Sequence, residues 1–80
     1  MSGQEQDMAA EIEALEADLA SLEAEKTAVA KRVRELMDAE DPRAGVCYAQ
    51  EIFAAKQEKL TLETRHEIAR RRRNRLLQGM

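Results

Sequence analysis

The chain has 80 residues, of which 44% are hydrophobic, 36% are charged and only 2% are aromatic, and its formal net charge is −3. This length allows one small domain with a marginal core. One cysteine and one histidine exclude an internal disulfide and a zinc site made of these two residue types. Abundant Ala, Glu, Leu, Arg and Lys with only three Gly and one Pro is typical of long helices, so we expect an all-α fold.

Residues 1–7 are polar and acidic, without the basic start and apolar core of a secretory signal peptide. No apolar run has the length needed to cross a bilayer. These features predict a cytoplasmic protein that is not associated with a membrane, and nothing in the sequence predicts a cofactor or a small-molecule substrate.

The first predicted helix covers about residues 7–39, with Asp7 or a residue near it as the cap. Its apolar residues follow the heptad spacing of a coiled coil. Lys26 is the polar exception; it either fixes register or oligomeric state, or extends its ammonium group to solvent. The apolar heptad positions are Met8, Ile12, Leu15, Leu19, Leu22, Val29, Val33 and Leu36.

A turn of about residues 39–45 follows, because Pro42 disfavours a helical conformation at Asp41. Asp41 as N-cap and Pro42 as first helical residue predict a second helix beginning at about 42, unless Gly45 delays its start to about 46. A short connection makes the two helices antiparallel neighbours. We therefore predict a single helical-hairpin domain.

The second predicted helix, about residues 42–78, has a broad apolar face that indicates more than one neighbour. Two series with seven-residue spacing run along it. They are Tyr48, Ala55, Leu62, Ala69 and Leu76 on one side, and Val46, Phe53 and Leu60 on the other, with Ile52 between them.

Charge is divided unequally between the two halves. Residues 1–41 hold 12 acidic and 4 basic side chains, a net −8, and residues 42–80 hold 4 acidic and 9 basic, a net +5. A hairpin in which Leu36 lies near Gly45 places Glu11 opposite Arg70. This division favours the antiparallel hairpin and disfavours a parallel dimer with acidic segments face to face.

Two helices in contact along one line leave apolar surface exposed near the turn, and such patches mark interfaces. We expect a homo-oligomer, with a dimer favoured: an antiparallel four-helix bundle similar in architecture to Rop-type dimers. A different protein partner on the same patch is the alternative. The candidate interface residues are Leu36, Met37, Val46, Tyr48, Ile52, Phe53 and Leu60.

An arginine run closes the second helix. Successive helical residues point about 100° apart, so these arginines cannot all face the first helix. Either they close the hairpin and compensate the helix dipole, or some contact nucleic-acid phosphates. A net charge of −3, a pI near 5.2 and the lack of aromatic residues near the run favour the first interpretation. The candidate phosphate contacts are Arg65, Arg70, Arg71, Arg72, Arg73 and Arg75.

No motif predicts catalysis. We interpret His66 as a surface or interface histidine, and Cys47 as a small buried residue near the turn, the alternative being an intermolecular disulfide or redox-sensitive thiol. The sequence thus predicts a non-enzymatic protein–protein interaction module, a small oligomeric adaptor or regulator of bacterial or phage type. The alternative is a nucleic-acid-binding helical scaffold.

Residues 55–63 (AKQEKLTLE) resemble the second-helix pattern of the small YdcH-type bacterial hairpins. The oligomerisation segment of phage small terminases is similar at the level of a helical hairpin. Both resemblances imply the hairpin fold and add no site residue.

Overall fold

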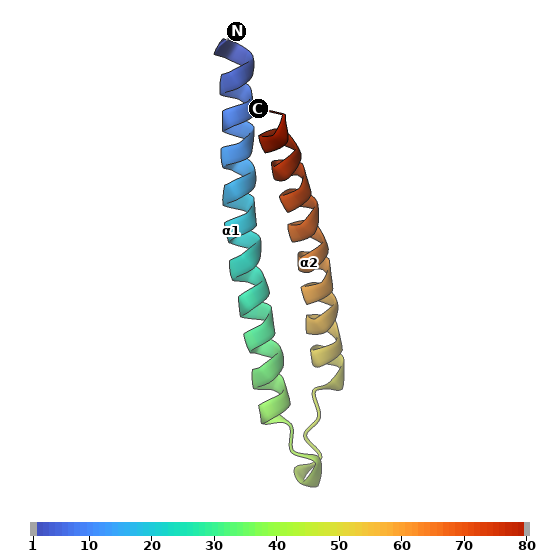
Figure 1. Cartoon of the computed structure of the whole chain (residues 1–80). Coiled ribbons are helices and arrows are strands. Elements are labelled where there is room, and N and C mark those ends of the chain that lie inside the picture. The colour runs from blue at the N-terminus through green and yellow to red at the C-terminus, as the bar shows by residue number, and fades with distance from the viewer. Residues whose placement is uncertain (1, 80) are drawn as a thin grey trace.

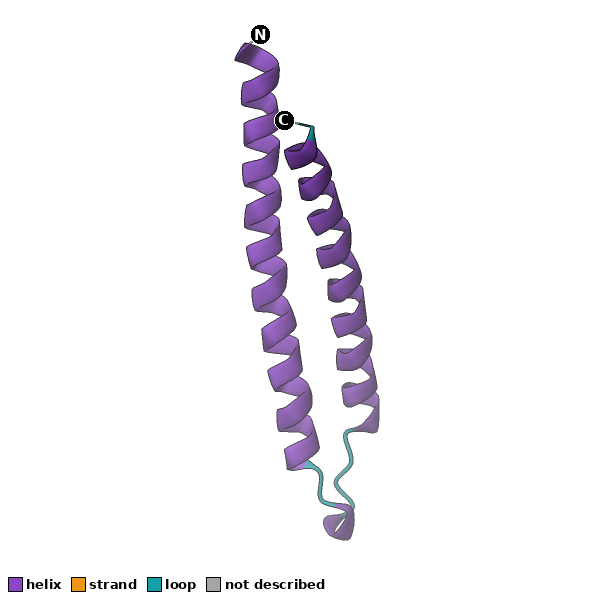
Figure 2. Cartoon of the chain, viewed as in Figure 1, coloured by secondary structure: helices purple, strands orange, loops and turns teal. Residues whose placement is uncertain are grey.

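The structure is a computed structural model that describes the backbone of residues 2–79 and the side chains of residues 7–79. Two long helices, α1 (Ser2–Ala39) and α2 (Ala49–Gln78), run antiparallel and side by side (Figure 1). A short 3-10 helix, η1 (Pro42–Ala44), lies in the connection between two loop segments (Figure 2). The molecule is a rod of 68 × 14 × 13 Å, and the expected all-α helical hairpin is confirmed.

Helix α1 begins at Ser2, so Asp7 lies inside the helix and does not cap it. The heptad interpretation holds along its length: Ile12, Leu15, Leu19 and Val29 are buried against α2. Gly79, which follows the end of α2, lies beside the Met8 side chain of α1. The residues of α1 before Met8 therefore extend beyond the end of α2 (Figure 1).

Lys26, the polar heptad residue, is half-buried, and its Nζ lies 3.6 Å from Oε2 of Glu23 on the same helix. Its aliphatic stem is therefore covered while its ammonium group has a carboxylate neighbour, the arrangement expected of a lysine that reaches outward from a core position.

Asp41 caps a turn, as expected, but the turn does not become α2. Its Oδ1 accepts hydrogen bonds from the backbone N–H groups of Arg43 and Ala44, at 3.1 and 3.3 Å. Gly45 then adopts a left-handed conformation (φ 76°), which ends η1 after three residues. Backbone hydrogen bonds between Asp41 and Val46, at 3.0 and 2.9 Å, close the loop.

The expected start of the second helix near residue 42 is therefore wrong, and α2 begins at Ala49. The connection spans residues 40–48 and is longer than expected. As a result, each residue of α1 lies opposite a residue of α2 that comes later in the sequence than predicted. Glu11 pairs with Arg72 rather than Arg70, with an Nη2–Oε1 distance of 3.2 Å.

The centre of the core is formed by Val29 on α1 with Ala55 and Leu62 on α2, and Leu22 and Val33 pack against it. Ile52 is also buried, toward the turn. The core is a single seam between two helices, so the far side of each helix is left to solvent or to a partner.

Neither helix in the described range 2–79 combines the length and the apolar character needed to span a membrane.

Candidate interaction surface

The seven predicted interface residues do not form one exposed patch. Ile52 is 8% exposed and belongs to the seam between the helices, so it is not available to a partner. Leu36, Val46 and Tyr48 are half-buried. The exposed members are Met37, Phe53 and Leu60.

Phe53, Leu60 and Ile68 form an exposed apolar stripe on α2, which we call the outer stripe. Their exposed fractions are 65%, 55% and 61%, the highest among the large hydrophobic residues of the described chain. At about 100° per residue, the three side chains lie within an arc of about 80°. Ala55 and Leu62, which pack against α1, point in roughly the opposite direction.

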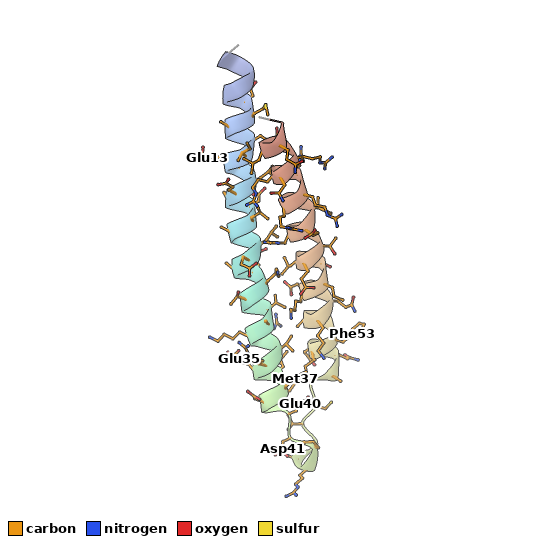
Figure 3. All side chains as sticks on the ribbon, in the orientation of Figure 1. Glu13, Glu35, Met37, Glu40, Asp41 and Phe53 are labelled. Carbon is orange, nitrogen blue, oxygen red and sulfur yellow. The ribbon has the colours of Figure 1, made fainter. Side chains whose placement is uncertain are left out.

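Phe53 and Leu60 therefore face away from α1, and Phe53 can be seen on that side of α2 (Figure 3). Ile68 lies at the edge of this face, where it also borders the groove between the two helices. A hollow of about 350 Å³ lies along the outer stripe, lined by Leu60, Glu63, Thr64, Glu67, Ile68 and Arg71. The stripe thus combines protruding apolar side chains with a recess between them, which suits contact with another helix.

Sequence reasoning found Phe53 and Leu60 but missed Ile68. The series Val46, Phe53, Leu60 has strict seven-residue spacing, and its next member is Glu67. A straight helix has 3.6 residues per turn, so a seven-residue series drifts around it and the residue eight positions on also joins the stripe. A search for steps of both seven and eight finds Ile68.

A second recess runs along one side of the hairpin, between the helices. It is an open groove of about 400 Å³ whose walls include Leu15 and Leu22 of α1 and Ala69 of α2. Asp18, Arg65 and Arg72 line it as well, so its rim is charged. Ile68 of the outer stripe also lines this groove, and it is the one large exposed apolar residue among the described lining residues.

The arginine run is largely paired within the chain. Glu67 accepts from Arg70, with Nη2–Oε1 at 2.7 Å and Nε–Oε2 at 3.1 Å, and from Arg71, with Nε–Oε1 at 3.0 Å. The hydrogen bond from Arg70, supported by that from Arg71, lowers the pKa of Glu67 from 4.5 to about 2. The same hydrogen bond raises the pKa of Arg70.

The remaining arginines divide into two groups. Arg72 bonds to Glu11 across the hairpin, and Arg73 donates to Oδ1 of Asn74 at 3.2 and 3.4 Å. Arg65 and Arg75 make no ion pair within the side chains that the structure describes. Of the six predicted phosphate contacts, these two have guanidinium groups without a side-chain acceptor among residues 7–79.

His66 lies half-buried at the seam, with its Nε2 3.5 Å from Oε2 of Glu23 on α1. The same carboxylate neighbours Lys26. The position of His66 at the seam is consistent with its predicted role as an interface residue, with the interface being internal to the hairpin.

Cys47 is exposed, so the expectation that it is a small buried residue is wrong. It lies in the loop between Val46 and Tyr48, which the longer connection moves out of the helical seam. Between residues 2 and 79, no three His, Cys, Asp or Glu side chains gather in an arrangement that could hold a metal ion.

Comparison with known proteins gives no match to any family model, curated protein or solved structure. The resemblance of residues 55–63 to the YdcH-type hairpins therefore remains a short local pattern, and function has to be argued from the surfaces described above.

Proposed function

We propose that this chain is a non-enzymatic protein–protein interaction module, an adaptor or regulator that self-associates and works by binding. The observation that supports the proposal best is the outer stripe of Phe53, Leu60 and Ile68. Three large apolar side chains in a row on the side of α2 opposite its internal partner are costly to leave in water. Covering them with another helix gives a dimer of four helices in total.

The stripe also has the neighbours that an interface needs. Lys56 and Glu63 carry charges along one edge of it, Arg71 lies on its line beyond Ile68, and Gln57 and Thr64 lie between its apolar members. An apolar centre with a polar rim is the usual composition of protein interfaces. We therefore place the contact along α2 rather than at the turn, where Ile52 is buried within the hairpin.

The proposal is tested by size-exclusion chromatography with light scattering over a range of protein concentrations. The wild-type chain is expected to show a mass that rises from one copy to two as concentration increases. Phe53→Asp, which puts a charge at the most exposed apolar position of the stripe, is expected to remain monomeric at concentrations where the wild type is dimeric.

Ala24→Asp is the matched control, because Ala24 is exposed on α1 and the substitution adds the same charge to an exposed helical position. It should leave dimer formation unchanged. Loss of the dimer in Ala24→Asp but not in Phe53→Asp would place the interface on α1. A monomer at all concentrations would contradict self-association.

Nucleic-acid binding is the second candidate, and the observation that favours it is the absence of an internal carboxylate partner for Arg65 and Arg75 in the described chain. Phosphate binding through these two residues predicts that replacing both with Gln weakens binding to a single-stranded oligonucleotide and reduces its dependence on salt. Replacing Arg70 and Arg71, which Glu67 already holds, should have a smaller effect. Equal effects of the two double variants, or no binding by the wild type, would contradict this candidate.

A further inference from the structure

We infer that the occupant of the outer stripe is α2 of a second copy, in antiparallel orientation, with Leu60 at the two-fold axis. This inference deepens the proposed self-association and rests on it. It specifies which helices meet, in which direction and in which register.

The position of the stripe decides which helices meet. In a square four-helix bundle each helix touches two neighbours about 90° apart around its axis. The outer stripe instead lies roughly opposite the face of α2 that packs on α1, as the directions of Leu60 and Leu62 show. A helix that covers this stripe therefore lies on the far side of α2 from α1, so that the four helices of the dimer form one row. The two α2 helices lie in the middle of the row, and each α1 lies at an outer end.

The spacing of the stripe sets the register. Phe53 and Ile68 lie at similar distances along the helix on either side of Leu60, seven and eight residues away. In an antiparallel pair centred on Leu60, the numbers of facing residues sum to 120. Each Phe53 then comes level with Glu67 of the other copy and packs beside the neighbouring Ile68, and the two Leu60 side chains meet. The contact is then self-complementary, as a two-fold interface requires, and extends over about 36 Å from Ala49 to Arg72.

Charge complementarity supports a second copy as the occupant. Lys56 and Glu63 lie on the same edge of the stripe, since seven residues make nearly two helical turns, and neither forms an ion pair within the described chain. In the antiparallel register, Lys56 of each copy comes opposite Glu63 of the other. Two unpaired charges of one chain are thereby matched twice across the two-fold axis.

The parallel orientation brings like charges together. Arg71 lies on the line of the outer stripe, beyond Ile68. In a parallel pair Arg71 faces itself, and both arginine runs lie at the same end. In the antiparallel pair Arg71 comes opposite Gln50, and each arginine run approaches the other copy's connection, where Glu40, Asp41 and Arg43 together carry a net charge of −1. The antiparallel pair is therefore favoured electrostatically.

A charge-swap experiment tests the register without removing any apolar side chain. Lys56→Glu and Glu63→Lys are each expected to weaken the dimer by roughly threefold to tenfold, because each replaces two attractive pairs by two repulsive ones. The double variant Lys56→Glu/Glu63→Lys is expected to restore the wild-type dissociation constant. The three variants and the wild type are compared by sedimentation at low ionic strength.

Disulfide trapping tests the orientation independently, in a Cys47→Ser background that removes the exposed native thiol. Chains carrying Phe53→Cys are mixed with chains carrying Ile68→Cys, one of them enlarged by a tag, and the products are separated on non-reducing gels. The mixed disulfide should exceed either homodimeric product, and Leu60→Cys should form a disulfide with itself. Ala24→Cys on α1 gives the background from random collision.

The outcomes separate the two claims. A self-disulfide of Phe53→Cys without the mixed product would show a parallel pair and overturn the inference. A wild-type dimer in which the double charge swap restores nothing and no cysteine exceeds the Ala24→Cys background would place the interface elsewhere, overturning the inference while self-association stands. A wild type that stays monomeric would overturn both.

Discussion

The two faces of α2 can be distinguished with one pair of substitutions of the same residue type. Leu62 is 5% exposed and packs with Val29 and Ala55, whereas Leu60, two residues earlier, is 55% exposed on the outer stripe. Leu62→Ala removes buried methyl groups and leaves a cavity in the seam, which costs 2–5 kcal/mol in typical cores, so we expect about 2–3 kcal/mol in this thin seam. Leu60→Ala removes a half-exposed side chain and gains helix propensity, so we expect less than about 1 kcal/mol within one hairpin.

The assay is urea denaturation followed by circular dichroism, at a concentration where light scattering shows one copy. At higher concentration the wild type and Leu62→Ala should both gain stability from association, because binding to the folded state stabilises it by mass action. Leu60→Ala should gain less. If Leu60→Ala lost as much stability as Leu62→Ala in the monomer, the assignment of the inner and outer faces of α2 would be refuted.

Three further predictions concern the turn and the arginine run. Gly45→Ala should destabilise the hairpin by about 1–2 kcal/mol, because alanine is strained in the left-handed backbone conformation of this position. Steric clash does not contribute, since a Cβ there meets no atom within 4 Å. Gly79→Ala, at φ −74°, is the control and should be neutral in the same denaturation assay. Asp41→Ala should cost about 0.5–2 kcal/mol, because the N–H groups of η1 lose their acceptor, whereas Asp41→Asn should retain most of that stability; equal losses in both variants would contradict the capping role. The carboxylate of Glu67 should titrate near pH 2 by NMR, because hydrogen bonds from Arg70 hold its pKa below 4.5. The contribution of the ionised Glu67 carboxylate to stability is therefore fully present above about pH 4.5 and is lost as pH falls toward 2. The difference in thermal stability between wild type and Glu67→Gln should shrink over that interval. A constant difference would refute the pairing of Glu67 with Arg70 and Arg71.

The seam of the hairpin could be predicted from the sequence because its information is local and periodic. The heptad positions Ile12, Leu15, Leu19 and Val29 are buried as the pattern indicates. Periodicity indicates which residues share a face of a helix. That information is enough to predict which face packs against the other helix of an antiparallel hairpin.

The register could not be predicted, because it depends on how many residues the connection uses. The cap at Asp41 and the proline after it are genuine helix-start signals, and they do start a helix, η1. That helix ends after three residues at Gly45, whose left-handed conformation was not apparent from the pattern. The local signals were interpreted correctly, but the short helix they begin is not α2.

The pairing of the arginines could not be predicted for the same reason. Their directions around α2 follow from helical geometry, but the choice of acceptor depends on register and on neighbours within one turn. Glu67 holds Arg70 and Arg71 from its own helix, and only Arg72 reaches Glu11 on α1. Within α2 the single carboxylate of Glu67 offsets one unit of the charge of the run, an offset that the net +5 of residues 42–80 already includes. Across the seam the run makes one ion pair, that of Arg72 with Glu11.

This local pairing bears on the dimer as well. If the arginines were all bound to α1, Arg71 would not contribute to the choice between the two orientations of a second copy, and Lys56 and Glu63 alone would favour the antiparallel one. Because Arg71 lies in line with Phe53, Leu60 and Ile68 and is paired only with a neighbour on its own helix, its charge remains at the edge of the contact. A parallel copy would place two such charges against each other, whereas an antiparallel copy places each near Gln50. The outer stripe provides the affinity, and Arg71, together with Lys56 and Glu63, determines the orientation.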